Sequence, residues 1–146
     1  MVIPMQPRQT PHVEALFLDF PGWSDHTTIF MQLAQWLRLM ITAGELRDGD
    51  RLPSARDLAT QLAINPMTVS EALRTLKDDS LVYAKRGQGM YVADGANEKC
   101  KAEEMALMSE RDIPQLIARL SRIGYRNDPA VKALQNLKSK LSSLPV

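Results

Sequence analysis

The sequence predicts a mainly α-helical protein with one small β-hairpin and a short helical tail. Three observations support this prediction. Two short segments with helical spacing are separated only by a tight connection at residues 63–65, as in two helices packed across a turn. The pattern then changes to strand-like runs around two glycines. Residues 94–146 return to helical spacing with no strand pattern.

The composition is that of an ordinary globular chain and excludes several classes of protein. The 146 residues are 45% hydrophobic and 24% charged, with a net charge of +1, which favours a folded domain. No apolar run reaches the roughly 20 residues of a membrane span, and prolines interrupt any secretory signal. A single cysteine, Cys100, cannot form an internal disulfide and fits a reducing compartment. We therefore expect a cytoplasmic protein with no membrane partner.

The N-terminal elements are an arm and a helix. Residues 1–26 hold four of the nine prolines, which predicts an arm with a short strand at Ala15–Phe20, where aliphatic and aromatic residues cluster. Thr28–Ala43 has apolar residues on one helical stripe. Thr27 or Thr28 can cap the start of this helix. Its end is expected at the glycine that follows, since glycine adopts the left-handed conformation readily.

A turn-rich connector, Glu45–Pro53, leads to the second helix. Ser54 and Asp57 form a weak capping box for a helix over Ala55–Leu62, which should bury Leu58 and Leu62.

The third helix has the sharpest start. Asn65 is a strong N-cap and Pro66 suits the first helical position. Its inward stripe is Val69, Leu73 and Leu76, whereas Met67, Ser70, Glu71, Arg74 and Asp78 lie away from that stripe.

Two strands are expected after the third helix. Leu81–Lys85 and Met90–Ala93 are rich in valine and tyrosine, and the turn between them contains Gly87 and Gly89. Three helices followed by a hairpin indicate a winged helix-turn-helix. The tail should then contain a helix that kinks or restarts near Asp112 because of Pro114, and another opened by Asp128-Pro129. Amphipathic helices of this kind must pack on each other, on the winged domain or on a second copy.

The helix opened by Asn65 is typical of a recognition helix that enters the DNA major groove by its N-terminal end. There the Thr68 or Ser70 hydroxyl would meet phosphates, and outward side chains such as Arg74 would meet base edges. Lys85 and Arg86 flank a glycine at the hairpin tip, beside Gln88, where they can approach a phosphate backbone or minor groove closely. The alternatives are a helix-turn-helix that only packs or contacts protein, and hairpin charges that are merely solvated.

Arginine in the first turn of a helix is unfavourable for the helix dipole, so Arg56 is a candidate for binding guanine or phosphate. Its alternative is a surface ion pair with a carboxylate such as Asp50. Arg51 is a weaker phosphate candidate. We expect no enzyme, no metal site and no cofactor, since His12 and His26 lie in the arm, away from any catalytic or zinc-ligand pattern. The seven basic and two acidic residues of 111–146 fit the solvated side of the tail helices or a supplementary DNA contact.

The run from Leu46 to Val92 resembles the GntR family of bacterial transcription regulators. The resemblance is strongest over Gly49–Ala59, Ile64–Ser70 and Arg86–Val92, and it extends back to Ile29–Leu33. It implies a winged helix that binds palindromic operators as a homodimer. Matched by position, it places DNA contacts on Arg56, Asn65, Met67, Thr68, Ser70, Lys85, Arg86 and Gly87.

The short tail resembles that of the YtrA-like subfamily, which implies dimerisation through the tail and repression of operons of ABC transporters. The N-terminal strand of that subfamily has a counterpart at Leu16–Phe20. Ser80 and Met67 depart from the family pattern, in which glycine usually follows the recognition helix and a polar residue usually stands at the second position.

The sequence therefore predicts an arm (1–26), a winged helix-turn-helix (27–93) and a helical dimerisation region (94–146). The expected function is a homodimeric repressor that binds double-stranded DNA. The alternative is a winged-helix module that docks a protein. A buried effector cavity is hard to place in so short a tail, and the sequence identifies no effector.

Overall fold

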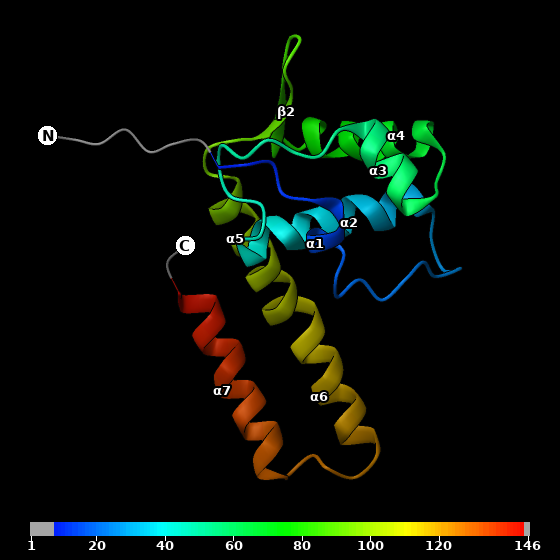
Figure 1. Cartoon of the computed structure of the whole chain (residues 1–146). Coiled ribbons are helices and arrows are strands. Elements are labelled where there is room, and N and C mark those ends of the chain that lie inside the picture. Colours follow the sequence, from blue (N-terminus) through cyan, green and yellow to red (C-terminus); the bar gives the residue numbers. More distant parts are fainter. Residues whose placement is uncertain (1–7, 145–146) are drawn as a thin grey trace, which may run out of the picture. The chain divides into compact units, whose positions relative to one another are not determined.

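The computed structural model describes residues 8–144, and the chain divides into two compact units, residues 1–97 and 98–146 (Figure 1). Residues 1–7 of the expected arm lie outside the described part. Unit 1 contains α1 (Val13–Leu16), α2 (Ile29–Ala43), α3 (Ala55–Leu62), α4 (Pro66–Asp78), β1 (Val82–Lys85) and β2 (Gly89–Val92). Helix α5 (Ala96–Leu107) spans the division, and unit 2 continues with the π-helical turn η1 (Met108–Asp112), α6 (Ile113–Arg122) and α7 (Pro129–Ser143).

Local capping residues set the ends of the helices in unit 1. The Ser54 hydroxyl accepts a hydrogen bond from the Asp57 N–H at 3.0 Å, and the Asn65 side chain accepts one from the Met67 N–H at 2.8 Å. Gly44 ends α2 in the left-handed conformation, with φ of 81°. These three expectations are confirmed. Thr28 is the N-cap residue of α2, but its side chain makes no capping hydrogen bond.

The core of unit 1 lies between α2 and α4 and extends under the hairpin. Leu33, Leu37 and Ile41 of α2 are fully buried, and so are Val69 and Leu76 of α4. Leu58 of α3 is also fully buried, whereas Leu62 is only half-buried. This core fixes α4 against α2 and α3 against α4, with the outer sides of α3 and α4 left to solvent.

The expected strand at Ala15–Phe20 is wrong, because the segment begins with the one-turn helix α1. Val13 and Leu16 lie three residues apart and are both buried, a spacing that a helical turn provides and an alternating strand does not. The Trp36 indole N–H donates to the Leu16 carbonyl at 2.9 Å. The segment therefore belongs to the core of unit 1 as a helical turn.

The hairpin is more extensively bonded than the sequence predicts. β1 and β2 pair antiparallel, with Val82 opposite Val92 and Lys85 opposite Gly89. The connector also bonds to β2: the Leu52 N–H donates to the Met90 carbonyl, and the Val92 N–H donates to the Asp50 carbonyl, both at 2.8 Å. The connector, which the sequence predicts to be a loop, therefore pairs with β2 through a short β-bridge between Arg51 and Tyr91.

Unit 2 is a helical hairpin. The backbone passes from α5 through the wide turn η1 into α6, with Pro114 at the start of α6. A wide turn of this kind accommodates a proline, which has no N–H to donate. Gly124 follows α6 with φ of 96°, and the Asp128 side chain caps α7 by accepting from the Ala130 N–H at 2.9 Å. The expected Asp128 cap is confirmed. The helix does not restart near Asp112, because Leu107, Asp112 and Ile113 all keep right-handed helical dihedral angles on either side of the π-helical turn.

Candidate nucleic-acid interface

One face of unit 1 brings together the two helices of the helix-turn-helix and the hairpin. In Figure 1 the hairpin projects from the body of unit 1 on the side where α3 and α4 lie. The candidate residues are exposed, apart from the half-buried Thr68. They are Arg51, Arg56, Asn65, Met67, Ser70, Arg74, Lys85, Arg86, Gly87 and Gln88.

The N-terminal end of α4 has a divided role. The Asn65 side-chain oxygen is used to cap the helix, so this residue first of all fixes where α4 begins. Met67, two residues later, has 75% of its surface exposed. An apolar side chain makes no hydrogen bond with water, but it can contact the methyl group of thymine at a base edge. The capping residue thus holds the backbone while its neighbours face outward.

A groove of about 520 Å³ lies between α4, the start of α3 and β2. Three cations line it, Arg51, Arg74 and Lys77, together with the carboxylate of Asp78. Ser54 and Ala55 place the N-terminus of α3 at its edge, where backbone N–H groups and the helix dipole favour an anion. The sequence analysis missed Lys77, although Ser70, Arg74 and Lys77 recur at the helical spacing that places side chains on one face.

Gly89 holds Arg51 in this groove. A Cβ atom at Gly89 would lie 3.0 Å from Nε of Arg51, and the φ of Gly89 is 105°. The absence of a side chain therefore lets the guanidinium lie against the backbone of β2. Arg51 also forms a β-bridge with Tyr91. Its side chain is thus positioned by both the connector and the hairpin, which a sequence pattern does not reveal.

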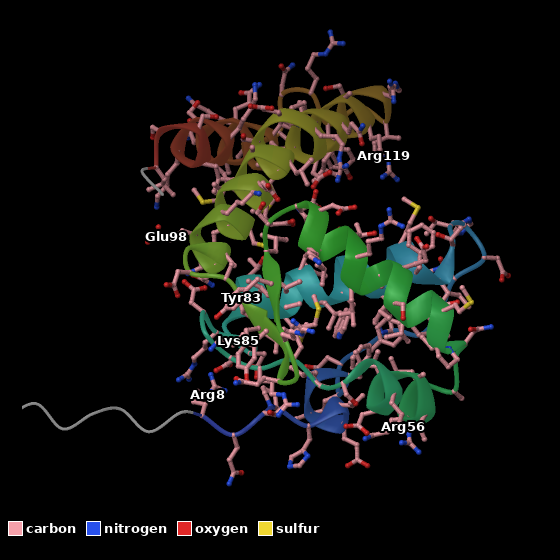
Figure 2. The ribbon with its side chains drawn as sticks, turned by 90° about the horizontal axis from the view of Figure 1, so that it is seen from above. Arg8, Arg56, Tyr83, Lys85, Glu98 and Arg119 are labelled. Carbon is pink, nitrogen blue, oxygen red and sulfur yellow. The ribbon has the colours of Figure 1, made fainter. Side chains whose placement is uncertain are left out.

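The hairpin presents cations on an aromatic support. The Tyr83 and Tyr91 rings are stacked with centroids 5.9 Å apart, and Nζ of Lys85 lies 4.6 Å from the centroid of Tyr91. Gly87 adopts φ of 76° at the turn, and the Gln88 N–H donates to the Lys85 carbonyl at 2.9 Å. Figure 2 shows Tyr83 and Lys85 along the same strand. The tip is therefore a closed turn with Arg86 exposed on it.

The structure removes the proposed ion pair between Arg56 and Asp50. Asp50 is 6% exposed, accepts from the Arg47 N–H at 2.9 Å and pairs with Nη1 of Arg8 at 3.2 Å. Within residues 8–144, Arg56 has no ion pair, and Figure 2 shows it apart from Arg8. The guanidinium at the start of α3 is therefore available to a ligand. The pairing of Arg8 with Asp50 ties the arm to the connector.

Among the described residues no group of three or more histidine, cysteine or acidic residues could hold a metal ion. No helix within residues 8–144 has the length and apolar character that crossing a membrane requires. The described face thus offers cations, hydroxyls and amides, the groups that contact phosphates and bases.

The chain is similar in sequence to several known transcription regulators. The chain is 34% identical over 91 residues to the HTH-type transcriptional repressor YtrA of Bacillus subtilis, which covers 62% of this chain and 69% of that protein. It is 34% identical over 68 residues to the HTH-type transcriptional regulator YhcF of the same organism, over 47% of this chain and 56% of YhcF. It is similar to the repressor MngR of Escherichia coli over only 29% of that longer protein, at 35% identity.

Solved structures show the same fold. A GntR family transcriptional regulator from Listeria monocytogenes matches with a TM-score of 0.64 at 25% identity, over 78% of this chain and 98% of that one. A transcriptional regulator from Oenococcus oeni matches with a TM-score of 0.65 at 23% identity, over 81% and 97% of the two chains. Residues 31–92, which include α3, α4 and the hairpin, match the family described as bacterial regulatory proteins, gntR family. The chain therefore belongs to the GntR family, as a YtrA-like transcriptional regulator with a winged-helix DNA-binding domain.

Proposed function

We propose that this regulator is a repressor that binds a palindromic operator as a homodimer held together by unit 2. The observation that supports it best is the exposed set of cations and hydroxyls around one groove of unit 1, with Arg56 free of ion pairs within the described chain. The alternative, a winged-helix module that docks a protein without binding an operator, requires none of these cations.

Each part of the face has a separate task in this proposal. The N-terminal end of α4 enters the major groove, where Met67 and Ser70 meet base edges and Thr68 meets a phosphate. Arg51, Arg74 and Lys77 line the groove and neutralise phosphates. The hairpin tip, with Arg86 exposed, follows the backbone or the minor groove. Phosphate contacts of this kind position the protein, and base contacts supply the sequence preference.

Unit 2 supplies the reason for a dimer. Leu116, Ile123 and Leu137 are 42%, 69% and 44% exposed, although each belongs to an amphipathic pattern that should face an apolar partner. A second copy would cover this surface through a two-fold axis. Two copies would present two α4 helices to half-sites about 34–36 Å apart, or a multiple of that distance, so the operator would be palindromic.

DNA binding is tested by measuring the affinity of the protein, at increasing salt concentration, for a duplex that contains an inverted repeat from the region upstream of its neighbouring genes. Binding driven by phosphates weakens steeply as salt rises. Arg56→Ala and Arg86→Ala should each cost about 1–3 kcal/mol of operator affinity. Arg126→Ala, at an exposed position in the loop of unit 2, is the control and should bind as the wild type does. Unchanged binding by both test variants would support the protein-docking alternative.

The dimer is tested with charges placed on the apolar surface of unit 2. Leu116→Asp and Leu137→Asp should yield monomers in sedimentation and weaken operator binding at least about tenfold, because one half-site is lost. Gln115→Asp and Gln135→Asp, at exposed positions of α6 and α7, add the same charge beside the surface and should remain dimeric. Dimers in all four variants would exclude this surface as the interface.

The proposed target is an operon of an ABC transporter, which the resemblance to the YtrA-like subfamily implies. Deleting the gene should raise transcription of a neighbouring operon that encodes such a transporter and carries the inverted repeat. Unchanged transcript levels would exclude this target, whereas lower levels would indicate an activator instead of a repressor.

A further inference from the structure

A second cavity lies in unit 1 between α2 and the segment that precedes it. Its volume is about 590 Å³, which is within the range of small-molecule sites. Both tryptophans of the chain, Trp23 and Trp36, line it together with Phe20. None of its lining residues is charged. Candidate DNA contacts do not line this cavity.

One side chain fixes the loop that forms a wall of this cavity. The Gln32 amide nitrogen donates to the carbonyls of Ser24 and Thr27, both at 2.9 Å, and its oxygen accepts from the Ser24 N–H at 2.8 Å. A single amide thus fastens the loop to α2 at both ends. The wall is held in place without a ligand, so a ligand would not have to bear the entropy of ordering it.

The aromatic rings form the other wall. Phe20 packs edge-to-face on Trp23 and on Trp36, with centroids 4.7 Å and 5.1 Å apart. The Trp36 N–H is already bonded to the Leu16 carbonyl, which fixes the orientation of this ring. Fixed rings offer their faces and edges to another aromatic ring in offset or edge-to-face geometry.

The chemistry of the lining restricts the ligand. The cavity is open to solvent on one side, and a charged group would find no opposite charge in its lining. The Gln35 amide lines the cavity, is exposed and has no hydrogen bond with residues 8–144. It can therefore bind one polar substituent.

We propose that this cavity, lined by Phe20, Trp23, Gln32, Gln35 and Trp36, is a binding site for a small uncharged aromatic molecule. This site is distinct from the proposed operator face and does not depend on it.

The test uses the neutral probe N-phenyl-1-naphthylamine and the full chain. The wild type should bind it saturably, one probe per chain, with a rise in probe emission. Gln35→Trp fills the cavity from an exposed position, and Trp23→Ala removes one wall. Each should weaken binding at least about tenfold. Ala43→Trp adds the same ring at an exposed position of α2 outside the cavity and should bind like the wild type.

Far-ultraviolet circular dichroism of each variant confirms that the helices are retained. Equal probe binding by all four proteins, or no saturable binding by the wild type, would overturn the proposal. If the wild type fails to bind the probe and Gln35→Trp alters the oligomeric state in sedimentation, the cavity is instead a contact between copies, and the proposal is wrong. Operator binding is a separate measurement, so failure of either proposal leaves the other intact.

Discussion

The two units of this chain differ in how they treat their apolar side chains. In unit 1, Leu33, Leu37 and Ile41 on one side of α2 are completely buried. In unit 2, Ile113 and Val131 are buried, whereas Leu137, in a comparable helical pattern, is 44% exposed. Unit 1 therefore buries its core with its own elements, while two antiparallel helices leave an apolar surface uncovered. On the proposed dimer, the stability of unit 1 would be a property of one chain, whereas that of unit 2 would depend on the partner.

The largest expected effect is the difference in stability between substituting Leu37, which is buried in unit 1, and Leu137, which is exposed in unit 2. Leu37→Ala should lower the free energy of unfolding of unit 1 by about 2–5 kcal/mol, because it leaves a cavity in a closed core. Leu137→Ala should change the unfolding of unit 1 by no more than about 0.5 kcal/mol, while weakening self-association. Chemical denaturation at several protein concentrations measures both.

The dependence of unfolding on protein concentration shows whether the exposed apolar surface of unit 2 is covered by a second copy or has no partner. The denaturant concentration at the midpoint of unfolding of unit 2 should rise with protein concentration, since association stabilises only the folded form. A midpoint of unit 2 that stays constant from low to high concentration would mean that its exposed leucines have no partner.

A smaller effect compares the helix caps of the two units. Ser54→Ala and Asp128→Ala each remove a side-chain oxygen that accepts from a backbone N–H, at a cost of about 1 kcal/mol. Amide hydrogen exchange should show the loss in α3 for the first variant and in α7 for the second. Ser54→Thr and Asp128→Asn retain the cap and serve as controls. Faster exchange across both units from one substitution would show that they unfold together.

The smallest effect concerns residues with a left-handed backbone. Ala63 and Ser80 in unit 1 have φ of 54° and 60°, where a Cβ atom is unfavourable. Ala63→Gly and Ser80→Gly should each stabilise unit 1 by about 0.5–1 kcal/mol. Gly124 in unit 2 has φ of 96°, so Gly124→Ala should destabilise that unit by about 1 kcal/mol. Thermal denaturation measures these shifts, and destabilisation by the two glycine substitutions would contradict the argument.

The local parts of the fold were predictable because their causes lie within a few residues. Ser54 and Asn65 begin their helices through hydrogen bonds to residues two or three positions away. The predicted bounds of Ala55–Leu62 agree with α3. Asp128 begins α7 by the same kind of bond. Helix capping and a proline in the first turn depend only on neighbouring residues, so the starts of these helices can be predicted from one sequence.

The parts that could not be predicted depend on contacts between distant residues. The Ala15–Phe20 segment has strand-like composition, but the bond from Trp36 to Leu16 and the burial of Val13 are tertiary effects. The ion pair between Arg8 and Asp50 likewise joins residues far apart in sequence. In the candidate interface, sequence identified Arg51 but not Gly89 as the residue that makes room for it.

The position of the two tryptophans has a practical consequence for anyone who unfolds this protein. Both belong to unit 1, and the indoles at 23 and 36 are the only ones in the chain. Intrinsic indole emission therefore comes from the winged domain, and residues 98–146 contribute no indole of their own. Ellipticity at 222 nm, an optical signature of helices in general, follows both units together. A transition visible in ellipticity but invisible in indole emission would be the melting of the helical hairpin alone.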